Sequence, residues 1–147
     1  MSQLFFTHFS IVIPLVLIFG ALLAGKATLT EIKRRKVLRV TSITLGIATL
    51  IVAITFFNTP EQSSESLLIL NNINLTVLFL ISFMAIILIR FSERYLQGEK
   101  RAHQFWQWLL LSLASVSVVV LSNHLLLLWL GWVAISLCFH RLLLFYP

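Results

Sequence analysis

Residues 33–57 read KRRKVLRVTSITLGIATLIVAITFF, and this stretch decides the fold of the chain. Five cations stand among its first seven residues, and no charged residue follows between Val40 and Phe57. The length of this apolar run is close to the roughly 20 residues with which a helix crosses a bilayer. In hydrocarbon each backbone group without a hydrogen bond costs several kcal/mol, so a single spanning segment must be helical. The stretch therefore predicts a membrane-spanning helix over about residues 37–57, with a cationic end at one membrane surface.

The other cations follow the same pattern. All eleven lysines and arginines fall within residues 26–39, within residues 90–101, or at Arg141, and apolar stretches separate the three groups. When these stretches are threaded back and forth through a bilayer, every cation lies on one side, which the positive-inside rule identifies as the cytoplasm. The N-terminus is then predicted to lie outside.

Five apolar stretches give the predicted spans, at about residues 9–25, 37–57, 67–89, 105–121 and 124–146. Their length and continuous apolar character exclude barrel strands, so each is predicted to be an α-helix. The acidic segment 58–66 is an outer loop, and the charged connector after Arg90, with a break at Gly98, is cytoplasmic. The predicted fold is an all-α, polytopic transmembrane helical bundle, with residues 1–147 forming a single membrane domain.

Composition excludes several classes of function. Apolar residues make up 59% of the 147 residues and charged residues only 11%, which is too little polar surface for a water-soluble globule. The net charge of +6 does not indicate nucleic-acid binding, because the basic residues flank membrane spans, where anionic lipid is their expected partner. Paired carboxylates, an oriented nucleophile and a phosphate-binding glycine loop are all missing from the sequence, so no enzyme activity, cofactor or metal site is predicted in this chain.

Small and weakly polar residues recur at helical spacing in three of the predicted spans. Such stripes let helices approach closely in lipid, and they can also line an ion path. Hydroxyl groups can bond back to their own helix at little cost, which favours the packing interpretation. The stripes are Gly20 with Ala24 and Ala21 with Gly25 in the first span, Ser42, Gly46, Thr49 and Ala53 in the second, and Ser112, Ser115 and Ser122 in the fourth.

Ionisable groups inside a membrane are costly and usually functional, but here the central parts of the spans contain none. His140 and Arg141 lie near the cytoplasmic end of the fifth span. Arg141 is interpreted as a helix-end or lipid contact, because its long side chain can reach the interface. His140 shares a helical face with Ser136 and is a candidate for proton relay or gating, since imidazole titrates near neutral pH. Cys138, the single cysteine, is interpreted as a small buried residue.

The order of residues from Asn74 to Trp132 resembles a known family. The connector carries Phe91, Tyr95 and the pair Gly98-Glu99, and three further segments follow it: Gln104-Phe105-Trp106, Ser122-Asn123-His124-Leu125-Leu126 and Leu130-Gly131-Trp132. These segments resemble the N-terminal part of the antiporter-like subunits of respiratory complex I, the subunit L or chain 5 family. In that family a tyrosine-rich connector with Gly-Glu leads to a helix, a short turn, and a helix that carries Leu-Gly-Trp-Glu.

Val133 stands where the proton-pumping members of that family carry a glutamate after Gly-Trp. Valine cannot take up or release a proton. The tail from Trp132 to Pro147, with His140 and Phe145-Tyr146, resembles another branch of the superfamily, the B subunit of Dab-type inorganic-carbon uptake systems. This resemblance implies an inner-membrane protein of a bacterium, whose partner is a zinc-containing A subunit similar to a β-carbonic anhydrase. It also implies ion flow, of protons or sodium, coupled to CO2 or bicarbonate uptake.

The resemblance further implies that the chain is the N-terminal part of a larger subunit and does not conduct ions alone, because the channel-forming helices of the family come later. Two alternatives stay open. The first is a true subunit L of NADH-quinone oxidoreductase, or of a multisubunit cation/proton antiporter, which the valine and the tail argue against. The second is a small scaffold protein that uses its small-residue stripes only to bind partner helices.

Overall fold

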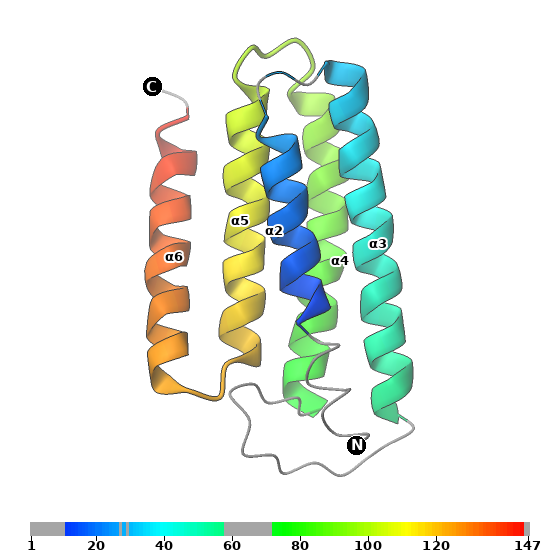
Figure 1. Cartoon of the computed structure of the whole chain (residues 1–147), viewed down its shortest axis with the longest axis vertical. Helices are drawn as coiled ribbons and strands as arrows, with labels where there is room; N and C mark the ends of the chain where they lie inside the picture. The colour runs from blue at the N-terminus through cyan, green and yellow to red at the C-terminus, as the bar shows by residue number, and fades with distance from the viewer. Residues whose placement is uncertain (1–10, 27, 29, 58–71, 146–147) are drawn as a thin grey trace.

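A computed structural model describes residues 11–26, 28, 30–57 and 72–145. Within these residues the chain forms five α-helices and no strand: α2 (Val12–Ala24), α3 (Glu31–Phe57), α4 (Asn72–Tyr95), α5 (Ala102–Leu121) and α6 (Leu125–Leu143). The helices run up and down, roughly parallel to one another (Figure 1). The all-helical bundle predicted from the sequence is confirmed.

Four of these helices, all but α2, are long and apolar enough to cross a membrane. The helix α2 is a shorter apolar helix in the described residues, and the first two residues of its predicted span, 9–10, lie outside them. The outer loop 58–66 and the predicted start of the third span, 67–71, also lie outside the described residues, as does residue 146 at the predicted end of the fifth.

Three helices extend beyond the predicted spans at the cationic end. The helix α3 begins at Glu31 rather than near residue 37, α4 continues to Tyr95 rather than ending near residue 89, and α5 begins at Ala102 rather than near residue 105. Lysine, arginine and glutamate are good helix formers, so the helices continue past the apolar stretch into the charged connectors. The predicted break at Gly98 is confirmed by its φ of 89°, which a side chain would strain.

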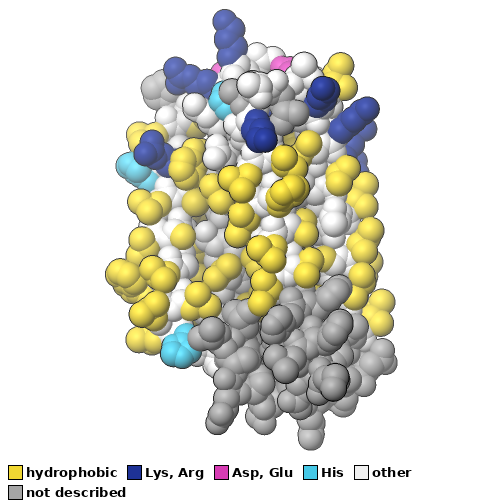
Figure 2. Space-filling view, viewed as in Figure 1, with side chains coloured by type: hydrophobic (Ala, Val, Ile, Leu, Met, Phe, Trp, Pro, Cys, Tyr) yellow, Lys and Arg dark blue, Asp and Glu magenta, His cyan; other side chains and the backbone are white. Residues whose placement is uncertain are grey.

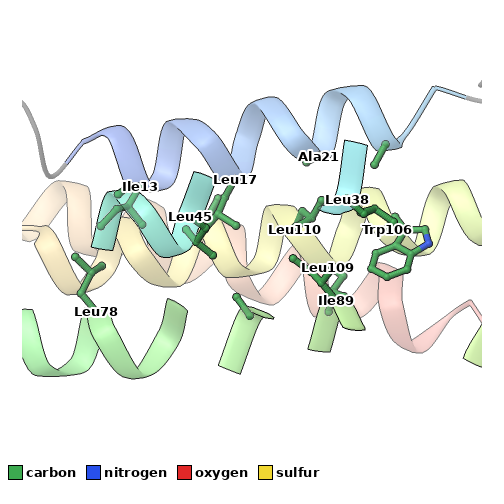
Figure 3. Packing of buried hydrophobic residues seen from close by; sticks show 14 of the residues in the cluster. Ile13, Leu17, Ala21, Leu38, Leu45, Leu78, Ile89, Trp106, Leu109 and Leu110 are labelled. Carbon is green, nitrogen blue, oxygen red and sulfur yellow. The ribbon is translucent and has the colours of Figure 1, made fainter. Parts of the chain in front are cut away.

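The helices α2, α3, α4 and α5 surround a common core, and α6 packs on the outside of α5 (Figure 1). Side chains from all four helices meet in this core, among them Leu17, Leu45, Leu78 and Leu110 (Figure 3). The helix α6 adds only partly buried side chains at its end, including Phe145, whose ring meets that of Phe105 edge to face. In the most apolar stretch of α6 only 11% of residues are buried, against 33–39% in α3, α4 and α5.

The lysines and arginines gather at one end of the bundle, and exposed hydrophobic side chains cover its waist (Figure 2). The end of α2, the start of α3, the α4–α5 connector and the end of α6 all meet at this cationic end (Figure 1). The predicted grouping of the cations on a single side is therefore confirmed. The belt of exposed leucine, isoleucine and phenylalanine is the surface expected of helices in contact with lipid.

Glycines mark the closest approaches between helices. A Cβ added at Gly20 of α2 would lie 2.6 Å from Cγ2 and 2.9 Å from Oγ1 of Thr41 in α3. A Cβ at Gly131 of α6 would clash with Cγ2 of Val119 in α5. At Gly46 the nearest atom, in the side chain of Ile86, would be 3.6 Å away, an ordinary contact. The small residues of α2 and α3 therefore act as packing surfaces, as predicted.

These three glycines allow a matched test. Gly20→Ala and Gly131→Ala should each lower the free energy of unfolding by about 1–3 kcal/mol, because the neighbouring β-branched side chains cannot move away freely. Gly46→Ala should raise it by up to about 1 kcal/mol, since alanine is the better helix former and the space is open. Unfolding in detergent, followed by circular dichroism, measures all three. Equal effects of the three substitutions would contradict the packing described here.

The direction of insertion can be tested by cysteine labelling in a Cys138→Ser background. Lys33→Cys and Lys100→Cys should react with a membrane-impermeant maleimide only after the cells are opened, because both positions lie at the cationic end. His124→Cys, at the exposed start of α6, should react in spheroplasts that are still intact. Labelling of Lys33→Cys and Lys100→Cys from opposite sides would overturn the topology.

Candidate functional site

Ser136, His140 and Arg141 lie on the last turns of α6, and all three side chains are exposed. The opposite side of the helix, which packs on α5, carries the buried residues Gly131 and Cys138. The structure therefore places the candidate relay residues on the outer surface of the bundle. It confirms that Cys138 is a small buried residue.

The hydroxyl of Ser136 and the backbone carbonyl of His140 form hydrogen bonds within the end of α6. The hydroxyl of Ser136 donates a hydrogen bond to the backbone carbonyl of Trp132, one turn earlier, at 3.0 Å. The backbone carbonyl of His140 accepts a bond from the N–H of Leu144 at 3.2 Å, which closes the helix end. The imidazole of His140 stays exposed and available to a partner.

Arg141 contacts the neighbouring helix. Its guanidinium carbon lies 5.7 Å from the centroid of the Trp108 ring in α5. A cation over an indole face is attracted by the electron-rich ring, so this contact ties the cationic end of α6 to α5. The role of Arg141 as a helix-end or lipid contact stays a prediction.

Hydroxyl groups in the small-residue stripes bond back to their own helices. Ser112 donates to the carbonyl of Leu109 at 2.7 Å, and Ser115 to that of Leu111 at 2.9 Å. The same pattern is found at Ser42, Thr49, Ser117 and Ser122. Because these donors are already used inside each helix, the stripes serve close packing, and the described helices hold no continuous row of free hydroxyls along them.

Val133, where the resemblance led us to expect a glutamate in proton-pumping relatives, lies on α6 with 39% of its side chain exposed. A titratable group at this position would face outward from this bundle.

A charged cluster at the cationic end was missed by sequence reasoning. A small cavity of about 30 Å³ lies between the start of α3, the end of α4 and the start of α5, and its walls include Glu31, Arg34, Glu93 and Trp106. Arg34 is only 8% exposed. Glu31, Arg34 and Glu93 were assigned to connectors in the sequence, but the helices extend far enough to bring them together beside Trp106.

Helical spacing was the signal that could have found this cluster. Arg34 continues the buried stripe of α3, at a distance of four residues from Leu38. On α4 the buried stripe runs from Ile89 to Ser92, three residues further, and reaches Leu96, four residues after Ser92 and just past the helix end. The change from apolar to charged residues hid the continuation of these buried stripes, because each predicted span stops at the end of its apolar run.

The cavity has the character of a water site. Its volume exceeds the roughly 10–15 Å³ that a water molecule requires, and Oε1 of Glu93 is buried with no hydrogen-bond partner in the described structure. A water molecule there would satisfy this oxygen. The cluster lies at one end of the bundle, so it can order water and charges at the membrane surface but does not provide a path across the membrane.

No group of three or more histidine, cysteine, aspartate or glutamate side chains in the described part of the chain could hold a metal ion.

Comparison with known proteins found no matching family model. The chain is 41% identical over 81 residues to the probable inorganic carbon transporter subunit DabB of Hydrogenovibrio crunogenus, covering 52% of this chain and 15% of that protein. It is 33% identical over 79 residues to NADH-quinone oxidoreductase subunit L of Escherichia coli, covering 54% and 13%. Against subunit L of Pseudomonas aeruginosa the identity is 30% over 86 residues, covering 58% and 14%.

The chain therefore matches only a small part, 13–15%, of the length of these relatives. The resemblance expected from the sequence is confirmed: over about half of its own length, this chain is similar to antiporter-like membrane subunits of the inorganic-carbon transporter and NADH-quinone oxidoreductase types.

Proposed function

We propose that this chain acts in a membrane subunit of an ion-gradient-coupled inorganic-carbon uptake system, in which proton or sodium flow accompanies accumulation of CO2 or bicarbonate. The observation that carries the proposal is the 41% identity to DabB, compared with 33% and 30% to the L subunits. A bacterial inner membrane is the location that follows from this proposal.

Two features of the residues support this choice. Val133 removes the carboxylate with which proton-pumping L subunits are expected to work, and valine cannot carry a proton. His140 and Arg141 keep titratable and cationic groups on the same helix, two turns further on, where they are exposed. An exposed imidazole at a helix end can exchange protons with water or with a group on a neighbouring helix.

The proposal includes a partner that carries the catalytic metal, a zinc-containing A subunit similar to a β-carbonic anhydrase. This chain would contribute the membrane part and no cofactor of its own. Co-purification of the full-length membrane subunit with a zinc protein from the same operon tests this point. A pull-down that recovers only quinone-oxidoreductase subunits would contradict it.

The similarity to subunit L keeps a second function in view, a proton-translocating subunit of NADH-quinone oxidoreductase or of a multisubunit cation/proton antiporter. The two functions give different phenotypes. Deleting the gene should abolish growth in air and leave growth at elevated CO2 intact if the protein serves carbon uptake. Loss of membrane NADH oxidation, or of tolerance to sodium, at every CO2 level would favour the second function.

His140→Gln in the full-length subunit should slow growth in air while leaving growth at elevated CO2 unchanged, because glutamine keeps the hydrogen-bonding capacity but cannot titrate. A loss of roughly 10-fold or more in bicarbonate uptake is expected if the imidazole relays protons. His124→Gln, at the other end of the same helix, is the matched control and should grow normally. Normal growth of both variants would assign His140 to the surface without a transport role.

A further inference from the structure

A second and larger cavity at the cationic end lies between α3 and α4. It has a volume of about 560 Å³, and its walls carry Arg35 and Arg39 from α3 and Arg90 and Arg94 from α4. Ile87 and Phe91 of α4 also line it. We call these six residues the arginine groove.

Helix geometry explains why four arginines meet there. Each pair is separated by four residues, so both members lie on one face of their helix, and the two faces turn toward the same groove. Glu93 is the only acidic residue in the walls, so the formal charge of the lining is four positive minus one negative, or +3. Like charges at this spacing repel one another, and an anion in the groove would relieve the repulsion.

The positive-inside rule does not require this arrangement. The rule counts cations near the ends of spans and is indifferent to the helix face on which they stand. Lys33, Lys100 and Arg101 also lie at the cationic end, yet none of them lines the groove. The convergence of Arg35, Arg39, Arg90 and Arg94 on one site is therefore a property of the tertiary structure.

The groove also has an apolar part. The side chain of Ile87 is 46% exposed and that of Phe91 is 67% exposed, and both stand beside the guanidinium groups. Further exposed apolar side chains, including Phe83, continue from Ile87 down the surface of α4 toward the waist of the bundle. A matching ligand is therefore both anionic and apolar, with its charge at the membrane surface and its chain in the hydrocarbon.

We propose that the arginine groove binds an anionic phospholipid of the leaflet at the cationic end. The guanidinium groups donate hydrogen bonds to its phosphate oxygens, for which the planar arginine fork is well suited, and its acyl chain lies along Ile87 and Phe83. The lipid would tie α3 to α4 at the end where their charged turns repel.

The test uses the full chain in neutral detergent, titrated with phosphatidylglycerol, with retained lipid counted by native mass spectrometry. Arg39→Gln with Arg90→Gln should weaken binding roughly 10- to 30-fold, because two charges that face the phosphate are removed. Lys33→Gln with Arg101→Gln removes the same net charge outside the groove and should change binding less than about threefold. Equal weakening by both pairs would show unspecific attraction and overturn the proposal.

Folding of the variants is checked independently. Glutamine is a good helix former, so circular dichroism should show unchanged helix content. Arg35→Gln with Arg94→Gln removes the other two arginines of the groove and should weaken lipid binding to a similar extent. Retention of the lipid by both folded arginine variants would contradict the proposal.

Three further binding experiments identify the chemical class of the ligand. Zwitterionic phosphatidylethanolamine should bind at least about 10-fold more weakly than phosphatidylglycerol. Ile87→Asn should weaken phosphatidylglycerol binding without changing binding of inorganic phosphate, and phosphate at about 10 mM should not displace the lipid. Equal retention of the two lipids would indicate ordinary boundary lipid, and displacement by phosphate would indicate a free-anion site. Either result would overturn the proposal.

Discussion

Exclusion of unpaired polar groups from hydrocarbon is the constraint on which this structure depends. Each crossing must satisfy its own backbone, which only a helix does within a single segment, and each permanent charge must stay near a membrane surface. The cations therefore collect at one end of the bundle, and apolar side chains cover its waist (Figure 2). The places where the chain crosses the membrane and the direction of each crossing follow from this separation.

Within the membrane, burial of one apolar side chain against another gains little, since lipid is equally apolar, so close approach determines which helices pack together. The contact of Gly20 with Thr41 brings α2 against α3, and that of Gly131 with Val119 brings α6 against α5. Serine and threonine hydroxyls take part without cost because they bond to carbonyls of their own helices. The result is a four-helix core with α6 attached to one side.

The cationic end of the bundle carries two polar sites of the described structure. Continuation of α3 and α4 beyond their apolar stretches brings charged residues from separate parts of the sequence onto shared surfaces. Two unlike sites result: a small cavity beside Glu93 with room for water, and a wide groove with four arginines and apolar walls. The described chain concentrates its polar chemistry at one surface, while α6 offers an exposed imidazole near the same end. About half of the chain is similar in sequence to DabB and to subunit L.

Sequence alone determined the class of fold, the number of apolar helices and the grouping of the cations. These properties depend on local composition and on the length of apolar runs, which are readable without knowing which helices touch. The break at Gly98 and the packing role of Gly20 were also predictable. Glycine adopts the positive φ found at Gly98, and its lack of a side chain allows the close approach of Thr41 at Gly20. The family resemblance came from short segments in the connector and in the last two helices.

Tertiary structure alone decided where the charged residues meet. Arg34 and Glu93 lie far apart in the sequence, and their shared cavity depends on helices that continue past the end of the hydrophobic signal. The outward position of Ser136 and His140 was equally hidden, because an all-round apolar helix gives no indication of the side that packs. Facing positions are fixed by contacts between helices, and these contacts depend on the rotation of each helix about its axis, which composition does not specify.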